Sequence, residues 1–273
     1  MRKVLFLDID NTLYSGRTGR VPDSALQAVE TARRNGSLVF LCTGRSRAEA
    51  SRYLNYPVDG FIFSSGTRCE LDGRVIFDHP IDPAVVESIA ETIRACDMGV
   101  LMGGAAGAYL DERCWREVEN YFSRPEADPE TKRRDMAENG MYPMAERDMK
   151  DPIYKMGATK AHGGSFEPLV QRLPESFRLI QTLSSPEGDF GDISDGSVMK
   201  RDGIRRVLAY LGEDIQNAVG IGDSENDLDM IQECGIGIAM GNASEAVKKA
   251  ADWITSDIDE DGIWNAFSHL GII

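Results

Sequence analysis

The sequence predicts an α/β fold in which a doubly wound, mostly parallel sheet is joined to an inserted second α/β domain. Apolar runs of strand length alternate with helical stretches early in the chain and again near its end. The first of these runs, Val4 to Leu7, is apolar throughout, as in parallel sheets covered on both faces. At 273 residues with 42% hydrophobic composition, the chain can bury a large core and form two domains.

The first strand is expected at Val4 to Leu7, a run too short for a helix. Asp8 and Asp10 follow it, and both carboxylates would point the same way if extended backbone continued through Ile9. Ligands of open parallel sheets collect beyond the carboxyl ends of the strands. These two aspartates are therefore candidate site residues, although an isolated Asp-x-Asp is equally typical of an ordinary polar strand end.

The first core segment is expected to continue with alternating helices and strands. The predicted elements are a helix over 23–35, a strand over 38–42, a helical stretch over 46–54 and a strand over 58–63. Thr43 and Gly44 follow the second strand, and Ser64 and Ser65 follow the third. Three strand ends would thus present Asp, Thr and Ser at one edge of the sheet.

The pattern changes after a hairpin expected over 70–81, whose turn is Asp72-Gly73. We expect a core segment at 1–81, an inserted α/β domain at 82–188 and a second core segment at 189–273. The inserted domain should contain helices over 84–95, 112–139 and 166–173, with strands near Val100 and Tyr109 and over 153–159 and 177–183.

In the last segment, predicted strands and helices alternate again, as they do in the first. Lys200 stands before a helix that ends at Leu211, and a strand over 217–221 runs into Gly222-Asp223-Ser224-Glu225-Asn226-Asp227. Asp223 would lie at the strand tip and Asp227 one turn into the next helix, so that both face one point. Asp229 is expected to be a surface charge. Strands over 235–240 and 251–255, with a helix over 243–250, complete the segment.

Charge and hydropathy exclude several functional classes. A net charge of −15 and a pI near 4.7 argue against nucleic acid or an anionic membrane as partner. No apolar stretch approaches the roughly 20 residues of a membrane span, and Asp8 interrupts the N-terminal apolar run too early for a signal peptide. We therefore expect a cytoplasmic protein whose five cysteines form neither a disulfide framework nor a zinc site.

Candidate site residues stand at strand ends or helix starts of one sheet: Asp8, Asp10, Thr43, Lys200, Asp223 and Asp227. Several carboxyl oxygens around one point suit Mg²⁺, with Lys200 as the balancing cation. A carboxylate can also act as a nucleophile and form an aspartyl-phosphate. These residues therefore permit magnesium-assisted chemistry on a phosphorylated substrate.

Four segments of the chain resemble, in order and spacing, the four motifs of the haloacid dehalogenase superfamily. They are Asp8-Ile-Asp10-Asn-Thr12, Thr43, Lys200 and Gly222-Asp223-Ser224-Glu225-Asn226-Asp227. With a domain inserted between the third strand and Lys200, the chain is similar to the Cof-type sugar-phosphate phosphatases. The resemblance implies a Rossmann-like core of that superfamily with an α/β cap domain. It covers both core segments, whereas the inserted domain matches only in length and strand-helix character.

The resemblance also implies roles for individual residues. Asp8 would attack phosphorus, and Asp10 would protonate the leaving oxygen and later activate water. Asp8, Asp223 and the backbone carbonyl of Asp10 would hold Mg²⁺, with Asp227 supporting the metal site. The groups expected around the substrate phosphate are Thr43, Gly44, Lys200 and Asn226.

We therefore expect a Mg²⁺-dependent phosphatase that hydrolyses small phosphorylated metabolites, with sugar phosphates favoured by the resemblance. A phosphomutase of the same superfamily is one alternative. A metabolite-binding protein without catalysis is another, although the intact set of aspartates and Lys200 speaks against it. The sequence specifies neither the particular substrate nor the oligomeric state.

Overall fold

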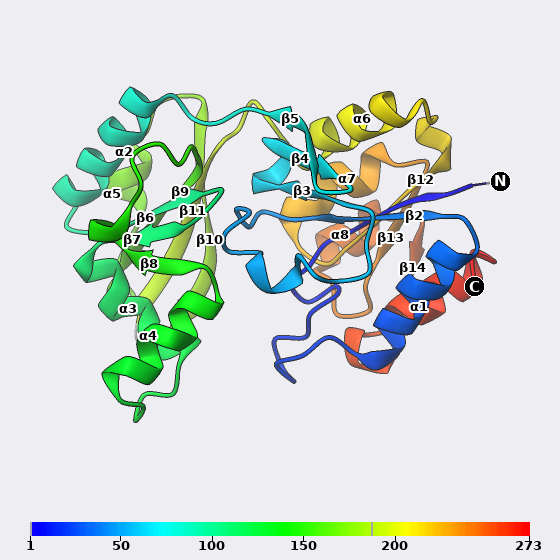
Figure 1. The fold of residues 1–273 in the computed structure, drawn as a ribbon, viewed down its shortest axis with the longest axis horizontal. Helices are drawn as coiled ribbons and strands as arrows, with labels where there is room; N and C mark the ends of the chain where they lie inside the picture. The colour runs from blue at the N-terminus through cyan, green and yellow to red at the C-terminus, as the bar shows by residue number, and fades with distance from the viewer. Residues whose placement is uncertain (1, 187) are drawn as a thin grey trace. The chain divides into compact units, whose positions relative to one another are not determined.

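The computed structural model describes residues 2–186 and 188–273, and the chain divides into two compact units (Figure 1). The core unit consists of the residues up to Gly44, Tyr56–Asp78 and Val198–Ile273. The cap unit consists of Arg45–Asn55 and His79–Ser197. Each unit has its own sheet and its own buried hydrophobic cluster.

The core unit is built on a mostly parallel sheet of eight strands among the described residues, in the order β14-β13-β12-β1-β2-β3-β4-β5. The strands from β14 to β3 are parallel, and β4 and β5 are antiparallel additions at one edge. Their bounds are β1 Val4–Leu7, β2 Leu38–Cys42, β3 Gly60–Phe63, β4 Arg68–Leu71, β5 Arg74–Asp78, β12 Ala218–Gly222, β13 Ile236–Ala239 and β14 Trp253–Ile254. The predicted α/β class with a parallel sheet is confirmed.

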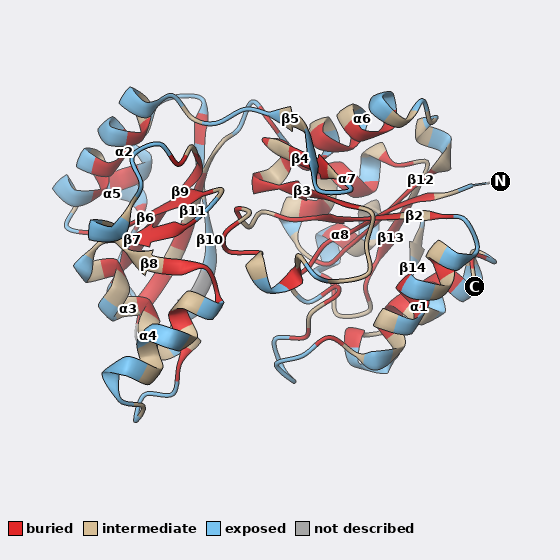
Figure 2. Cartoon of the chain, in the orientation of Figure 1, coloured by how far each residue is buried: buried red, intermediate tan, exposed pale blue. Residues whose placement is uncertain are grey.

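Helices cover both faces of this sheet, which explains why its parallel strands are apolar (Figures 1 and 2). The helices of the core unit are α1 Asp23–Arg34, α6 Lys200–Leu211, α7 Leu228–Glu233, α8 Glu245–Ala250 and α9 Gly262–His269. Val4 and Phe6 of β1 pack with Ile204 of α6 and Met230 of α7. Because side chains alternate along a strand, Asp8 continues the face of β1 that α6 covers.

The expected hairpin is present as β4 and β5. Asp72 and Gly73 between them both have positive φ, of 48° and 73°. Two successive residues with left-handed backbone conformation form a two-residue turn whose twist matches the twist of the strands that it joins.

The cap unit contains a second sheet, which is mostly antiparallel and has the order β10-β11-β9-β6-β7-β8. Only the β7–β8 pairing in it is parallel within the described residues. The strands are β6 Gly99–Gly104, β7 Ala108–Leu110, β8 Met141–Pro143, β9 Ile153–Lys160, β10 Phe177–Ser185 and β11 Gly188–Asp195. The helices are α2 Pro83–Ala95, α3 Glu112–Phe122, α4 Pro129–Glu138 and α5 Glu167–Val170.

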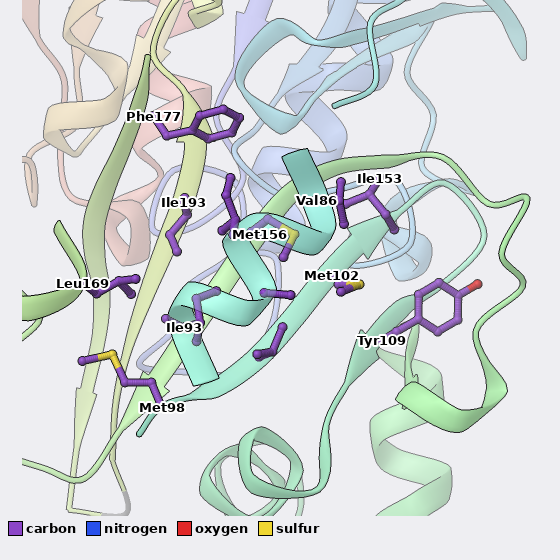
Figure 3. Packing of buried hydrophobic residues seen from close by; sticks show 14 of the residues in the cluster. Val86, Ile93, Met98, Met102, Tyr109, Ile153, Met156, Leu169, Phe177 and Ile193 are labelled. Carbon is purple, nitrogen blue, oxygen red and sulfur yellow. The ribbon is translucent and has the colours of Figure 1, made fainter. Parts of the chain in front are cut away.

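Helix α2 closes one face of the cap sheet (Figure 3). It begins at an Asp82 carboxylate that accepts a hydrogen bond from the Ala84 amide, with Pro83 at the first helical position. Its buried face packs on Met102, Met156 and Ile193 from three neighbouring strands. The cap unit therefore has a core of its own.

The expected domain division differs from the observed one. Residues 189–197 were expected in the core, but β11 pairs with β9 and β10 and belongs to the cap unit. Residues 45–55 also belong to the cap unit, because Ala48 packs beside Leu101 and its amide donates to the Gly104 carbonyl at 3.4 Å. Neither contact is visible in a local sequence pattern.

Three helical predictions were too long. The expected helix over 112–139 is interrupted between α3 and α4, where Pro125 and Pro129 disfavour continuation. Residues 46–54 form turns and one short 3₁₀ helix, Ser51–Tyr53. The helix expected over 166–173 is reduced to α5.

Among the residues that the structure describes, no helix combines the length and the apolar character needed to cross a bilayer. All five cysteines are free thiols, and four of them are buried.

We predict that Met156→Ala destabilises the cap unit by about 2–5 kcal/mol, because it opens a cavity in a close-packed core. Met156 is fully buried, whereas Met149 of the same unit is 72% exposed. The matched variant Met149→Ala should change the free energy of unfolding by less than about 0.5 kcal/mol. Urea unfolding followed by circular dichroism measures both, and similar losses would contradict the assignment of Met156 to the core.

Candidate functional site

The strand register brings the predicted site residues to one edge of the core sheet. Leu7 pairs with Ile221 of β12 on one side and with Leu41 of β2 on the other. The ladders extend beyond the strands, since the Asp8 amide donates to the Ile221 carbonyl at 3.0 Å and the Thr43 amide donates to the Ile62 carbonyl at 2.8 Å. The tips of β1, β2 and β12 therefore carry Asp8, Thr43 and Asp223 at the carboxyl edge, where parallel sheets bind ligands.

Lys200 joins this edge from the first turn of α6. Its ammonium donates to Asp8 Oδ1 at 2.6 Å and to Asp227 Oδ1 at 2.5 Å. Lys200 is only 1% exposed, and both carboxylates are also buried. These are charge-assisted hydrogen bonds in a region of low dielectric constant, where an unpaired charge would be strongly unfavourable.

Asp227 uses its second oxygen to hold the turn after β12. Oδ2 accepts from the backbone amides of Asp223 at 3.0 Å and Ser224 at 3.1 Å. Gly222 is required here, because a Cβ at this position would lie 2.4 Å from Asp227 Cγ. Asp227 therefore orients both Lys200 and the backbone that carries Asp223.

Asp8, Asp223 and Asp227 each have a carboxylate oxygen within 4.8 Å of the other two. Such a cluster of hard oxygen ligands fits a divalent cation of the Mg²⁺ type. Thr12 Oγ1 donates to Asp223 Oδ1 at 3.1 Å and fixes one oxygen of that carboxylate. The side chain of Asp10 is not part of this trio.

The electrostatics of the cluster also fit a cation. Burial, together with the charge of Asp227, raises the pKa of Asp8 well above its usual range and that of Asp223 to about 7. Burial by itself would lower the pKa of Lys200, but Asp227 and Asp8 outweigh it and raise that pKa. The positive charge of Lys200 alone is therefore not enough to keep the pKa values of Asp8 and Asp223 in their usual range.

Asp10 lies in a tight turn directly after β1. Asn11 has a φ of 57°, a left-handed conformation that asparagine tolerates. The Asn11 carbonyl accepts from Asn242 Nδ2 at 2.8 Å, and the Asn11 amide donates to the Tyr14 carbonyl at 2.8 Å. The half-buried Asp10 is therefore presented on a turn that is held from both sides.

The expected phosphate-binding residues lie beside this cluster. Thr43 is buried at the tip of β2, and Gly44 follows it. A Cβ added at Gly44 would lie 3.8 Å from Asn226 Nδ2, so the absence of a side chain leaves space beside that amide. Asn226 Oδ1 accepts from Ser224 Oγ at 2.6 Å, which directs the Asn226 amide group.

The structure corrects the prediction that Asp229 is a surface charge. Asp229 is buried, and Oδ2 accepts from the Arg201 amide at 2.8 Å in the first turn of α6. It therefore helps to fix the turn that carries Lys200. Thr12 and Asp229 are the two positioning residues to which sequence reasoning assigned no role, since their contacts span 211 and 28 residues of sequence.

Residues 5–267 match the family model of the haloacid dehalogenase-like hydrolases. The chain is 25% identical over 298 residues to YkrA of Bacillus subtilis, which carries a provisional phosphatase name, and the match covers 99% of this chain and 98% of YkrA. It is 28% identical over 278 residues to a Streptococcus pyogenes protein provisionally named a bifunctional phosphatase and peptidyl-prolyl cis-trans isomerase. That match covers 99% of this chain but only 54% of the streptococcal protein, so the chain spans about half its length.

A solved structure described as a sugar phosphatase of subclass IIB of the superfamily aligns with a TM-score of 0.76 and 26% identity, covering 99% of this chain and 100% of that one. The chain belongs to the haloacid dehalogenase-like hydrolases. These comparisons confirm the predicted family and the predicted enzyme class, a phosphatase of the haloacid dehalogenase type.

We predict that Lys200→Met lowers the free energy of unfolding of the metal-free protein by about 3–5 kcal/mol near neutral pH, because two buried carboxylates lose their cation. The control is Arg205→Met on the same helix, whose solvent-exposed ion pair with Glu233 should contribute much less to the free energy of unfolding. Urea unfolding in the presence of a chelator measures both variants. Equal losses would mean that Lys200 does not neutralise a buried cluster.

Proposed function

We propose that this protein is a Mg²⁺-dependent phosphatase that hydrolyses small phosphorylated metabolites, foremost sugar phosphates, through an aspartyl-phosphate formed on Asp8. The observation that carries the proposal is the convergence of Asp8, Asp223 and Asp227 around Lys200 at the carboxyl edge of the sheet. A nucleophilic carboxylate, a cation and a cluster of metal-type ligands are thus available at one point.

In this proposal Asp8 and Asp223 hold the metal with the backbone carbonyl of Asp10. Asp227 acts mainly by orientation, since Lys200 and two backbone amides already bind its oxygens. When bound, Mg²⁺ neutralises charge on the phosphoryl group and on the carboxylates, which lets one anion approach another.

The first step transfers the phosphoryl group to Asp8. An Asp8 carboxylate oxygen forms a bond to phosphorus while the bond from phosphorus to the leaving oxygen breaks. Asp10 donates its proton to that oxygen, so the product leaves as a neutral alcohol. Lys200, 2.6 Å from Asp8 Oδ1, holds the nucleophile in place and offsets the charge of the phosphoryl oxygens.

The second step returns Asp8 to its starting state. Asp10, now ionised, takes a proton from water as the water oxygen bonds to phosphorus. The bond from phosphorus to Asp8 breaks, and inorganic phosphate leaves. Thr43, Gly44, Asn226 and Lys200 would bind the phosphoryl oxygens in both steps, a role supported by their positions at the strand tips and helix starts of the core unit.

The preference for sugar phosphates is supported by the similarity to the solved sugar phosphatase of subclass IIB. A phosphomutase would use the same first step but must return the phosphoryl group to a sugar. Release of free phosphate from hexose phosphates separates the two, and turnover itself excludes a binding protein without catalysis. A cytoplasmic location remains a prediction from the sequence.

We predict that Asp8→Asn abolishes turnover of p-nitrophenyl phosphate in the presence of Mg²⁺, because the neutral amide cannot form the aspartyl-phosphate. The melting temperature should not fall, since the substitution removes a buried charge whose ionisation is disfavoured. Phosphate release is measured with and without Mg²⁺. The control is Asp78→Asn, a change of the same type on edge strand β5, which should leave turnover unchanged. Substantial turnover by Asp8→Asn would reject the proposed nucleophile.

We predict that Mg²⁺ binding weakens about tenfold between about pH 8 and about pH 6. Asp223 has a pKa raised to about 7, and the metal binds only its ionised form. The raised pKa also means that the metal-free protein loses stability as pH rises toward 7. The increase in melting temperature caused by Mg²⁺ should therefore be larger at the higher pH. An equal increase at both pH values would contradict the assignment of Asp223 as a ligand.

A further inference from the structure

Ser65 follows β3 at the edge of the sheet that carries the proposed phosphate-binding residues. The register pairs Cys42 of β2 with Ile62 of β3, so the residues after β3 lie beside Thr43 and Gly44. The Ser65 amide donates to the Thr43 carbonyl at 3.0 Å. A polar side chain at this strand tip was expected from the sequence, yet the mechanism above gives it no role.

The turn at this tip has an unusual backbone. Ser64, Ser65 and Gly66 all have positive φ, at 45°, 55° and 109°. Residues other than glycine and asparagine adopt this conformation reluctantly. Such strain persists only where the surroundings impose it, and it is concentrated at binding and catalytic sites.

Packing explains how the turn is imposed. Gly66 lies against the start of α6, where a Cβ would be 2.5 Å from the Met199 carbonyl oxygen. The turn is therefore held between the tip of β2 on one side and the first turn of α6, which carries Lys200, on the other. Both neighbours carry residues that the proposed function uses.

The Ser65 hydroxyl faces the space left open by Gly44. A Cβ at Gly44 would lie 3.7 Å from Ser65 Oγ and 3.8 Å from Asn226 Nδ2. A hydroxyl and an amide thus flank one point that no side chain of Gly44 fills. Ser64 differs, because its hydroxyl is buried and has no hydrogen-bond partner among the described residues.

We infer that Ser65 Oγ donates a hydrogen bond to a non-bridging oxygen of the substrate phosphoryl group, in the space beside Gly44 that Asn226 also borders. This inference rests on the proposed phosphatase function. Because the contact is to the phosphoryl group, it acts equally on every substrate and on inorganic phosphate.

The test compares Ser65→Ala with Ser64→Ala, the same change one residue away in the same strained turn. Ser65→Ala should lower kcat/KM by about 10-fold to 100-fold, the effect of losing one hydrogen bond to a charged group. The loss should be equal for p-nitrophenyl phosphate and glucose 6-phosphate. Affinity for inorganic phosphate, measured by calorimetry, should fall as well. The Ser65→Ala melting temperature should stay unchanged.

Ser64→Ala should leave kinetics and phosphate affinity unchanged, and its melting temperature should not fall, since it removes only an unpartnered buried hydroxyl. Ser65→Asn, which tolerates the left-handed backbone and offers an amide donor, should restore part of the lost activity. Wild-type kinetics and phosphate affinity in Ser65→Ala would overturn the inference. An equal loss in Ser64→Ala, or a loss confined to glucose 6-phosphate, would also overturn it.

The design separates failure of this inference from failure of the proposed function. If the wild-type protein hydrolyses neither substrate, the proposed function fails, and calorimetry with inorganic phosphate still decides the role of Ser65. If the wild type is active and Ser65→Ala matches it, only the present inference fails.

Discussion

The ammonium of Lys200, buried between the carboxylates of Asp8 and Asp227, is the interaction on which the rest of the site depends. Three segments meet in it: the tip of β1, the turn after β12 and the start of α6. A charge buried in a protein interior is tolerated only when its partners are held in good geometry. Three features therefore keep these groups in contact. They are the sheet register, Gly222 and the hydrogen bond from the first turn of α6 to Asp229.

Lys200 alone does not satisfy the charge of this edge. Burial and repulsion between the carboxylates raise the pKa values of Asp8 and Asp223. A second cation would reduce this repulsion and favour the ionised form of both groups. The site also contains left-handed residues at the tips of two strands, Asn11 after β1 and Ser64-Ser65 after β3. Repulsion between buried carboxylates and left-handed backbone therefore occur together at this edge, as is common at binding and catalytic sites.

In the cap unit, several buried polar groups are paired with groups of the same unit. The Asp151 carboxylate accepts from the amides of residues 105–107 and from the Tyr109 hydroxyl, so the glycine-rich loop after β6 is held by its own unit. Lys155 forms buried ion pairs with Glu49 and Asp192. The segment that directly follows Thr43 and Gly44 is thereby held against the cap sheet, and it belongs to the cap unit.

The sequence by itself determined the parallel core, the hairpin at Asp72-Gly73 and the set of polar residues at the strand tips. These follow from local rules: apolar runs form buried strands, and parallel strands share one carboxyl edge. Only the tertiary structure decided which groups touch. Thr12 binds Asp223, and buried Asp229 caps α6. Strand β11 and residues 45–55 belong to the cap unit. All of these features depend on contacts between distant segments, which leave no periodic pattern in the sequence.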